Sequence, residues 1–165
     1  MRFAPAAVAL SLALAVSSSV GIAKEREPDP RAASLIAQGR ASLAAGEMQP
    51  AIDAFEAALA VDPGYSPVFL ELANVARREG LQGKAIRFYR ELLTRDPGNL
   101  AAIAGEGSAL VEKGAVEKAR SNLAKLESLC GSNCAETRSL QASIAAGARP
   151  RMAAETSKDA DAAKN

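Results

Sequence analysis

Two cysteines near the end of the chain carry the most reactive side chains in this sequence. They stand at Cys130 and Cys134, separated by Gly-Ser-Asn, in the spacing Cys-x3-Cys. In an oxidising compartment such a pair is first interpreted as a disulfide, and closing so short a loop stabilises a fold by only about 2 kcal/mol. Redox-active pairs have the spacing Cys-x-x-Cys beside a βαβ pattern, and this sequence has neither. We therefore predict a structural disulfide between Cys130 and Cys134 and keep a thiol-redox factor as the alternative.

Other groups that could support catalysis are scarce. The sequence contains no histidine, which is the commonest general base and metal ligand, so the two cysteines lack the further ligands that zinc or haem attachment requires. Acidic residues such as Asp53 and Glu91 occupy solvated helical positions and are not paired for acid–base work. Gly105-Glu-Gly107 lacks the third glycine of a dinucleotide loop and follows no strand. The sequence predicts a protein that is not an enzyme and that has no catalytic residue, cofactor or metal site.

Charge and the N-terminal segment predict the partner class and the compartment. The chain has 20 Lys and Arg against 19 Asp and Glu without a basic cluster, which argues against nucleic acid as a partner. Residues 1–23 have the pattern of a secretory signal peptide: Arg2 precedes a short apolar run, and the small residues Gly21 and Ala23 stand at positions −3 and −1 of a cleavage site. An uncleaved anchor helix is the alternative, although the run is short for a span of ~20 residues. We expect an exported protein, with the bacterial periplasm as the favoured compartment and no stable membrane insertion after signal cleavage.

A pattern with a period of 34 residues runs through the middle of the chain and must position any functional side chain. Small residues, large apolar residues, turn glycines and prolines each recur in register. The aligned sets are Ala51, Ala85 and Ala119; Phe55, Tyr89 and Leu123; Leu35, Phe69 and Ile103; Gly39, Ala73 and Gly107; Gly46, Gly80 and Gly114; and Pro63 and Pro97. We expect the set at 39, 73 and 107 to let the two helices of a repeat approach closely. The set at 55, 89 and 123 should fill the space between consecutive repeats.

This helix–turn–helix pattern resembles the tetratricopeptide repeat (TPR) family. The resemblance covers about residues 30–130. It implies an all-α, right-handed α-solenoid of about three TPR repeats plus a C-terminal capping helix. The predicted segments are a signal peptide (1–23), a flexible leader (24–29), TPR 1 (30–65), TPR 2 (66–99), a degenerate TPR 3 (100–131), a capping helix (132–147) and a disordered tail (148–165).

Capping residues predict where several helices begin. Asp29 and Ser66 each precede a proline, and both have the pattern of an N-cap followed by proline in the first helical turn. Asn99 can cap the helix that opens the third repeat. The segment from Asn133 to Glu136 resembles a capping box that opens the last helix.

The TPR resemblance also implies where a partner binds, because the first helices of successive repeats line a concave groove in that family. Mapped onto this sequence, the predicted peptide- or partner-binding residues are Ile36, Arg40, Leu43, Leu70, Asn74, Arg77, Arg78 and Ser108. Asn74 stands where peptide-binding members often carry an asparagine that hydrogen-bonds the ligand backbone. Ala101 and Gly105 stand where members that clamp a C-terminal carboxylate carry cations, so recognition of that group is not expected.

We therefore expect a non-catalytic adaptor or scaffold that binds another envelope protein or peptide in this groove. Three arginines around an apolar floor would suit a peptide of mixed apolar and acidic character. Ordinary solvated charge is the alternative interpretation of those arginines. Besides the redox factor, a structural subunit of an envelope complex is the other alternative function, and the sequence leaves the oligomeric state unknown.

Overall fold

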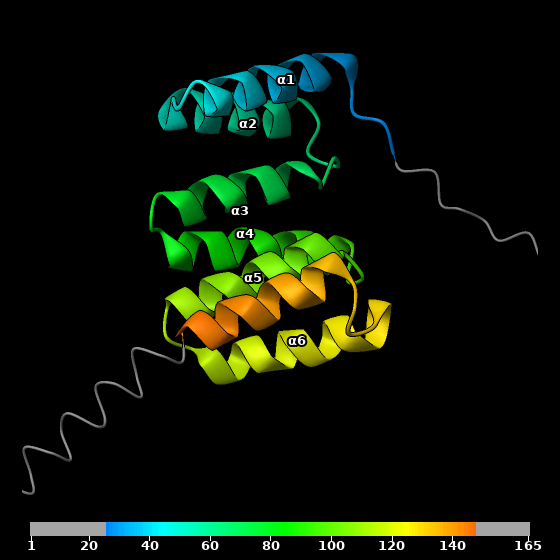
Figure 1. Cartoon of the computed structure of the whole chain (residues 1–165). Coiled ribbons are helices and arrows are strands. Elements are labelled where there is room, and N and C mark those ends of the chain that lie inside the picture. The colour runs from blue at the N-terminus through cyan, green and yellow to red at the C-terminus, as the bar shows by residue number, and fades with distance from the viewer. Residues whose placement is uncertain (1–25, 148–165) are drawn as a thin grey trace, which may run out of the picture.

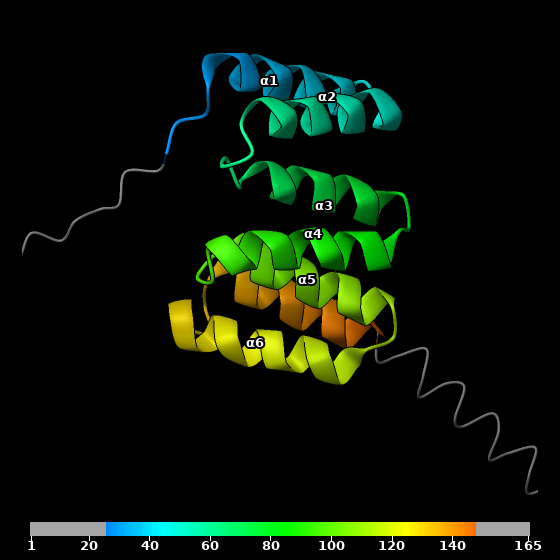
Figure 2. The same cartoon turned by 180° about the vertical axis from the view of Figure 1, so that it is seen from behind.

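The computed structural model describes residues 26–147, and within this range the chain consists of helices and short connections. The helices are α1 (Pro30–Ala44), α2 (Met48–Val61), α3 (Val68–Arg78), α4 (Gln82–Arg95), α5 (Leu100–Glu112), α6 (Val116–Cys130) and a C-terminal helix over residues 135–147. Figures 1 and 2 show them stacked in antiparallel pairs, with α1 and α2 at one end and α6 and the C-terminal helix at the other. The predicted all-α helical-repeat solenoid is confirmed. The predicted signal peptide and tail lie outside the described residues, and no described helix combines the length and apolar content needed to cross a membrane.

One type of turn joins the two helices of each pair. In the first turn the N–H of Glu47 donates to the carbonyl of Ser42 at 2.9 Å, and the same bond recurs at Leu81 and Ala115. These are Schellman bonds, which require a left-handed residue just past the helix end. That residue is a glycine with φ of 83°, 75° and 84° at Gly46, Gly80 and Gly114, respectively. No atom crowds Gly46 or Gly80, so the backbone conformation and not the space selects glycine there.

Two of the predicted helix caps are present and two starts differ. Asp29 accepts a hydrogen bond from the N–H of Arg31 at 2.8 Å, and Asn99 accepts one from the N–H of Ala102 at 3.0 Å. The prediction for Ser66 is wrong. Pro67 already has helical dihedrals, and the tight first turn uses the Ser66 carbonyl as its acceptor instead of the side chain.

The C-terminal helix begins one residue later than the predicted capping box implies. Its first residue is 135, and the carbonyl of Cys134 accepts a hydrogen bond from the N–H of Arg138 at 3.1 Å. Cys134, and not Asn133, therefore occupies the cap position.

Glycines allow close approach at two different levels of the stack. A Cβ at Gly39 would lie 2.6 Å from the ring of Phe55, so this glycine lets α1 approach α2, as predicted. A Cβ at Gly107 would lie 2.6 Å from a methyl group of Leu140, which belongs to the C-terminal helix. The prediction for Gly107 is wrong in this respect, because the glycine makes room for the following helix and not for its own partner α6.

The apolar core consists of three clusters that follow one another along the stack. Phe55 is fully buried in the first, which joins α1 and α2 to α3, and Tyr89 is fully buried in the second, which joins α3 and α4 to α5. Leu123 packs against the third, which joins α5 and α6 to the C-terminal helix. Each large residue of the repeat therefore fills the space toward the next pair, as predicted. Each pair buries its apolar face only against its neighbours, as in other solenoids.

The described part of the predicted leader is attached to the end of α2. Nη2 of Arg26 donates to Oδ1 of Asp62 at 2.9 Å, and the N–H of Asp29 donates to Oδ2 of the same carboxylate at 3.0 Å. Asp62 is buried. Residues 26–29, the described part of the predicted leader, thus contact the end of α2 through Asp62.

Candidate functional site

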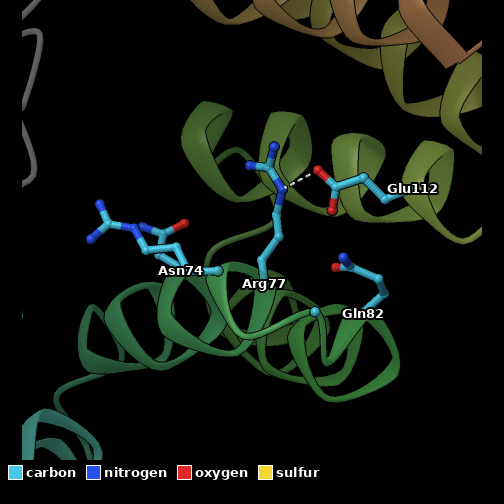
Figure 3. Close-up of a pocket in the computed structure, with 6 residues that line it drawn as sticks. Asn74, Arg77, Gln82 and Glu112 are labelled. Carbon is cyan, nitrogen blue, oxygen red and sulfur yellow. Dashed lines mark hydrogen bonds and ion pairs between the residues drawn. The ribbon is translucent and has the colours of Figure 1, made fainter. Parts of the chain in front are cut away.

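A hollow lies where α3 ends, α4 begins and α5 ends. We call it the α3–α5 pocket, and its volume is about 730 Å³. Its lining residues are Asn74, Arg77, Arg78, Gly80, Gln82 and Glu112. The left-handed turn at Gly80 brings the first residue of α4 beside the last turn of α3, and stacking of the second pair on the third brings the end of α5 opposite (Figure 3).

An ion pair crosses this pocket. Nε of Arg77 donates to Oε1 of Glu112 at 2.8 Å, so α3 and α5 are joined at the pocket wall. Burial by itself lowers the pKa of Arg77, but the hydrogen bond and charge of Glu112, with a smaller contribution from Tyr89, leave that pKa raised. The guanidinium is therefore a permanent cation whose orientation is set before any ligand arrives.

Asn74 is oriented by a buried tyrosine. The hydroxyl of Tyr89 donates to Oδ1 of Asn74 at 2.7 Å. Burial raises the pKa of Tyr89, and Arg77 opposes only part of the rise, so the hydroxyl keeps its proton at neutral pH. With its oxygen occupied, Asn74 presents its Nδ2 group as a hydrogen-bond donor.

Gln82 supplies an acceptor that no group of residues 26–147 uses. Its Oε1 atom is buried and has no hydrogen-bond partner among the described residues. Figure 3 shows the side chain beside Arg77 and Glu112 at the edge of the pocket. A buried acceptor without a partner lowers the stability of the fold by about 1–3 kcal/mol, and a hydrogen-bond donor on a bound ligand would recover that free energy.

The predicted site residues are only partly brought together. Asn74, Arg77 and Arg78 line the α3–α5 pocket. Arg40 lies outside it, where Nη2 pairs with Oε1 of Glu71 at 2.7 Å and joins α1 to α3. Leu43 and Leu70 are partly buried against the first and second core clusters, respectively.

Two of the predicted residues are buried. Ile36 is 5% exposed and belongs to the first core cluster. Ser108 is 4% exposed, and its hydroxyl lies 3.3 Å from that of Ser143 on the C-terminal helix. Ile36 therefore belongs to the core, whereas Ser108 is mostly buried but still lines a smaller hollow beside the C-terminal helix.

Gln82 and Glu112 were not among the predicted site residues. The 34-residue period could have indicated Glu112, because this residue stands one repeat after Arg78, the last residue of α3. In a stacked solenoid, equivalent residues of consecutive repeats lie beside each other. No comparable signal existed for Gln82, which reaches the pocket only because the Schellman turn folds α4 back on α3.

A smaller hollow continues beyond Glu112 toward the C-terminal helix. It has a volume of about 420 Å³ and is lined by Ser108, Val111, Glu112, Ser143, Ala146 and Gly147. The C-terminal helix lies beside α5 (Figures 1 and 2), and residues of both helices line this smaller hollow.

Cys130 and Cys134 are joined by a disulfide at the turn that leads into this helix. Oγ1 of the buried Thr137 donates to the carbonyl of Gly131 at 2.9 Å and lies 3.0 Å from Sγ of Cys134. The described residues include no free thiol. In this state the disulfide links the last residue of α6 to the residue that precedes the C-terminal helix.

Comparison with known proteins identifies the class of fold. No family model and no curated protein sequence matches the chain. Similar solved structures include the MamA protein, at 29% identity over 59% of this chain and 53% of that one, with a TM-score of 0.56. They also include the first TPR of Spaghetti (RPAP3) bound to the HSP90 peptide SRMEEVD, at 19% identity over 74% and 99% with a TM-score of 0.65. The Sgt2 TPR domain from Aspergillus fumigatus is 21% identical over 78% and 84%, with a TM-score of 0.64.

These neighbours are built from stacked helix pairs of the same kind. The chain therefore has the fold of the tetratricopeptide-repeat family, as the 34-residue period predicted. It spans about half the length of the MamA structure.

Proposed function

We propose that this protein is a non-catalytic adaptor that binds a peptide segment of another protein in the groove containing the α3–α5 pocket. The observation that carries the proposal is the preorganisation of the pocket. Glu112 orients Arg77, Tyr89 orients Asn74, and Gln82 keeps a buried acceptor available. Preorganised polar groups lower the ordering cost of binding.

The charges of the pocket favour a segment that carries carboxylates. Arg78 is exposed at the pocket and Asn74 offers an N–H donor, so both can engage an acidic side chain. Gln82 suits a donor such as a peptide N–H. A bound acidic peptide in the RPAP3 neighbour supports the same class of ligand.

The proposed compartment is the bacterial periplasm, and the proposed partner is an envelope protein or peptide. The support comes from the signal-peptide pattern of residues 1–23 and from the disulfide, which is typical of oxidising compartments. Mass spectrometry of the protein recovered from the periplasm tests this. A mature chain beginning at Lys24 is expected, and an intact Met1 would contradict signal cleavage.

Peptide binding tests the groove. The exported chain is titrated against labelled short peptides made of Leu, Val and Glu, and against a matched set with Gln in place of Glu. We expect the Glu set to bind at least about tenfold more tightly, because only a carboxylate forms an ion pair with Arg78 and can accept both hydrogen bonds of a bidentate contact. The double variant Asn74→Ala/Arg78→Ala should bind the Glu set about tenfold more weakly than the wild type does.

Arg40→Ala is the matched control, since it removes an exposed arginine outside the pocket. Its peptide affinity should stay at the wild-type value. Equal affinity for both peptide sets, or an unchanged affinity of the folded double variant, would overturn the assignment of function to this pocket. If the assignment holds, capture from an envelope extract by the wild type, but not by the double variant, would identify the partner.

A further inference from the structure

The outer face of the stack, formed by the exposed sides of α2, α4 and α6, has opposite charges on neighbouring repeats. On α2 it carries Asp53 and Glu56, both exposed. At the equivalent positions one repeat later, α4 carries Arg87 and Arg90, also exposed. This reversal of sign at matched positions divides the face into an acidic patch on α2 and a basic patch on α4.

Most of these charges have no ionic partner inside the described chain. Asp53 accepts a hydrogen bond from the neutral amide of Gln49, and Glu56 takes part in none of the ion pairs between described residues. The guanidinium of Arg87 and the ammonium of Lys84 lie 5.6 and 5.7 Å from the ring centre of Phe88. The ring holds these cations in place without neutralising them.

The basic patch borders a hollow between α4 and α6. This hollow has a volume of about 240 Å³, and its lining residues are Gly83, Ile86, Arg90, Leu110, Lys113, Ala115 and Lys118. Cations stand around an apolar floor, so the hollow fits a helix ridge that presents carboxylates beside small apolar side chains. The exposed side of α2 is such a ridge, because Ala57 and Ala60 accompany its two carboxylates.

We propose that the outer face binds a second copy of this chain, with α2 of each copy on the α4–α6 hollow of the other. A two-fold axis between the acidic and basic patches makes both contacts complementary, and each contact occurs twice, as in isologous dimers. Apposition of identical patches would instead place Asp53 opposite Asp53 and is disfavoured. The occupant therefore follows from charge complementarity, and this proposal does not depend on the peptide groove.

Sedimentation of the exported chain at several concentrations tests the dimer. It is run from about 1 μM to about 1 mM protein, where weak interfaces associate. Low salt, about 20 mM, is compared with about 0.5 M, where exposed charges are screened. We expect a monomer–dimer equilibrium whose dissociation constant rises about tenfold or more with salt. A monomer throughout the low-salt series would overturn the proposal, as would larger open assemblies.

Charge reversal identifies the surface. Asp53→Arg and Arg87→Glu should each remain monomeric alone, because each substitution gives the two patches charges of like sign at the contact. An equimolar mixture of the two should dimerise. In the mixed dimer the introduced arginine of one variant faces the introduced glutamate of the other, and at the second contact the unaltered Arg87 faces the unaltered Asp53.

Arg138→Glu, an equal charge change on the C-terminal helix, is the control and should dimerise like the wild type. Failure of the mixture to recover dimers would show that α2 and α4 do not face each other.

Discussion

Two equivalent junctions in the stack are filled by opposite chemistry. Where the first helix pair meets the second, Leu72 is 2% exposed and Phe88 packs against the core of both pairs. One repeat later, the same two positions hold Glu106, which is 7% exposed, and Asn122. The first junction is thus apolar, and the second contains a buried carboxylate with an amide.

The polar junction is stable because its groups satisfy one another. Nε of Arg90 donates to Oε1 of Glu106 at 2.6 Å, and Nδ2 of Asn122 donates to Oε2 at 3.0 Å and to the carbonyl of Ile103 at 3.2 Å. These bonds tie α4, α5 and α6 to one another. A repeat position can therefore be apolar or ionic, provided that every buried polar atom finds a partner.

The two junctions should respond differently to loss of a side chain, and the apolar one should give the largest effect. Leu72→Ala removes a fully enclosed side chain and leaves a cavity between the first and second pairs. We expect it to lower the free energy of unfolding by about 2–5 kcal/mol, measured by urea denaturation. Leu81→Ala, at a position that is 47% exposed, is the control and should cost less than about 1 kcal/mol. Equal losses of unfolding free energy in the two variants would mean that burial of Leu72 does not stabilise the junction.

The polar junction should tolerate conversion to the apolar kind. Glu106→Ala removes both acceptors and should cost about 1–3 kcal/mol, since hydrogen bonds of charged groups are lost. Glu106→Leu introduces the side chain found at the first junction, and Arg90 is exposed enough to be hydrated. We expect Glu106→Leu to stay within about 1.5 kcal/mol of the wild type, again by urea denaturation.

Glu117→Ala removes a carboxylate that also pairs with an arginine but is exposed, so it should change stability by less than about 0.5 kcal/mol. A Glu106→Leu variant less stable than Glu106→Ala would show that the second junction requires ionic groups and would break the equivalence of the two positions.

The period of the sequence predicts the scaffold because it depends on positions that every repeat must bury. Ala51, Ala85 and Ala119 are all fully buried, and the turn glycines all have positive φ. The ionic junction was not predictable in the same way. Glutamate is a residue type that usually lies on the solvated side of a helix. Only the approach of Arg90 and Asn122 makes the burial of Glu106 favourable.

The candidate site shows the same limit. Asn74, Arg77 and Arg78 were predictable because they lie on one helix face, and a helix face is a local property. Gln82 comes from the following helix, and Ser108 is covered by a helix that the repeat pattern does not describe. Which surfaces remain open depends on these contacts between elements, which neither spacing nor composition specifies.

The smallest expected effect concerns the end of α2, where Asp62 contacts the segment that precedes α1. Asp62 accepts from the backbone N–H of Asp29, which lowers its pKa below the ordinary value of 3.8; burial opposes this, and Arg26 adds to the lowering. A lowered folded pKa means that the carboxylate stabilises the fold fully above the unfolded pKa and that this contribution is lost as the pH falls through the folded pKa. Asp62→Asn should therefore reduce stability at neutral pH, and the difference from wild type should shrink below about pH 4.

Asp96→Asn is the matched control, because Asp96 ends α4 as Asp62 ends α2. Asp96 is exposed, and within the described part of the chain it accepts hydrogen bonds from Asn99 in its own turn. Urea unfolding of both variants from neutral pH to about pH 2 separates the two positions. A pH-dependent difference confined to Asp62→Asn would show that Asp62 is an ionic anchor between residues 26–29 and the end of α2. If both variants lost stability alike, the contacts of residues 26–29 would add nothing to the stability of an ordinary helix end.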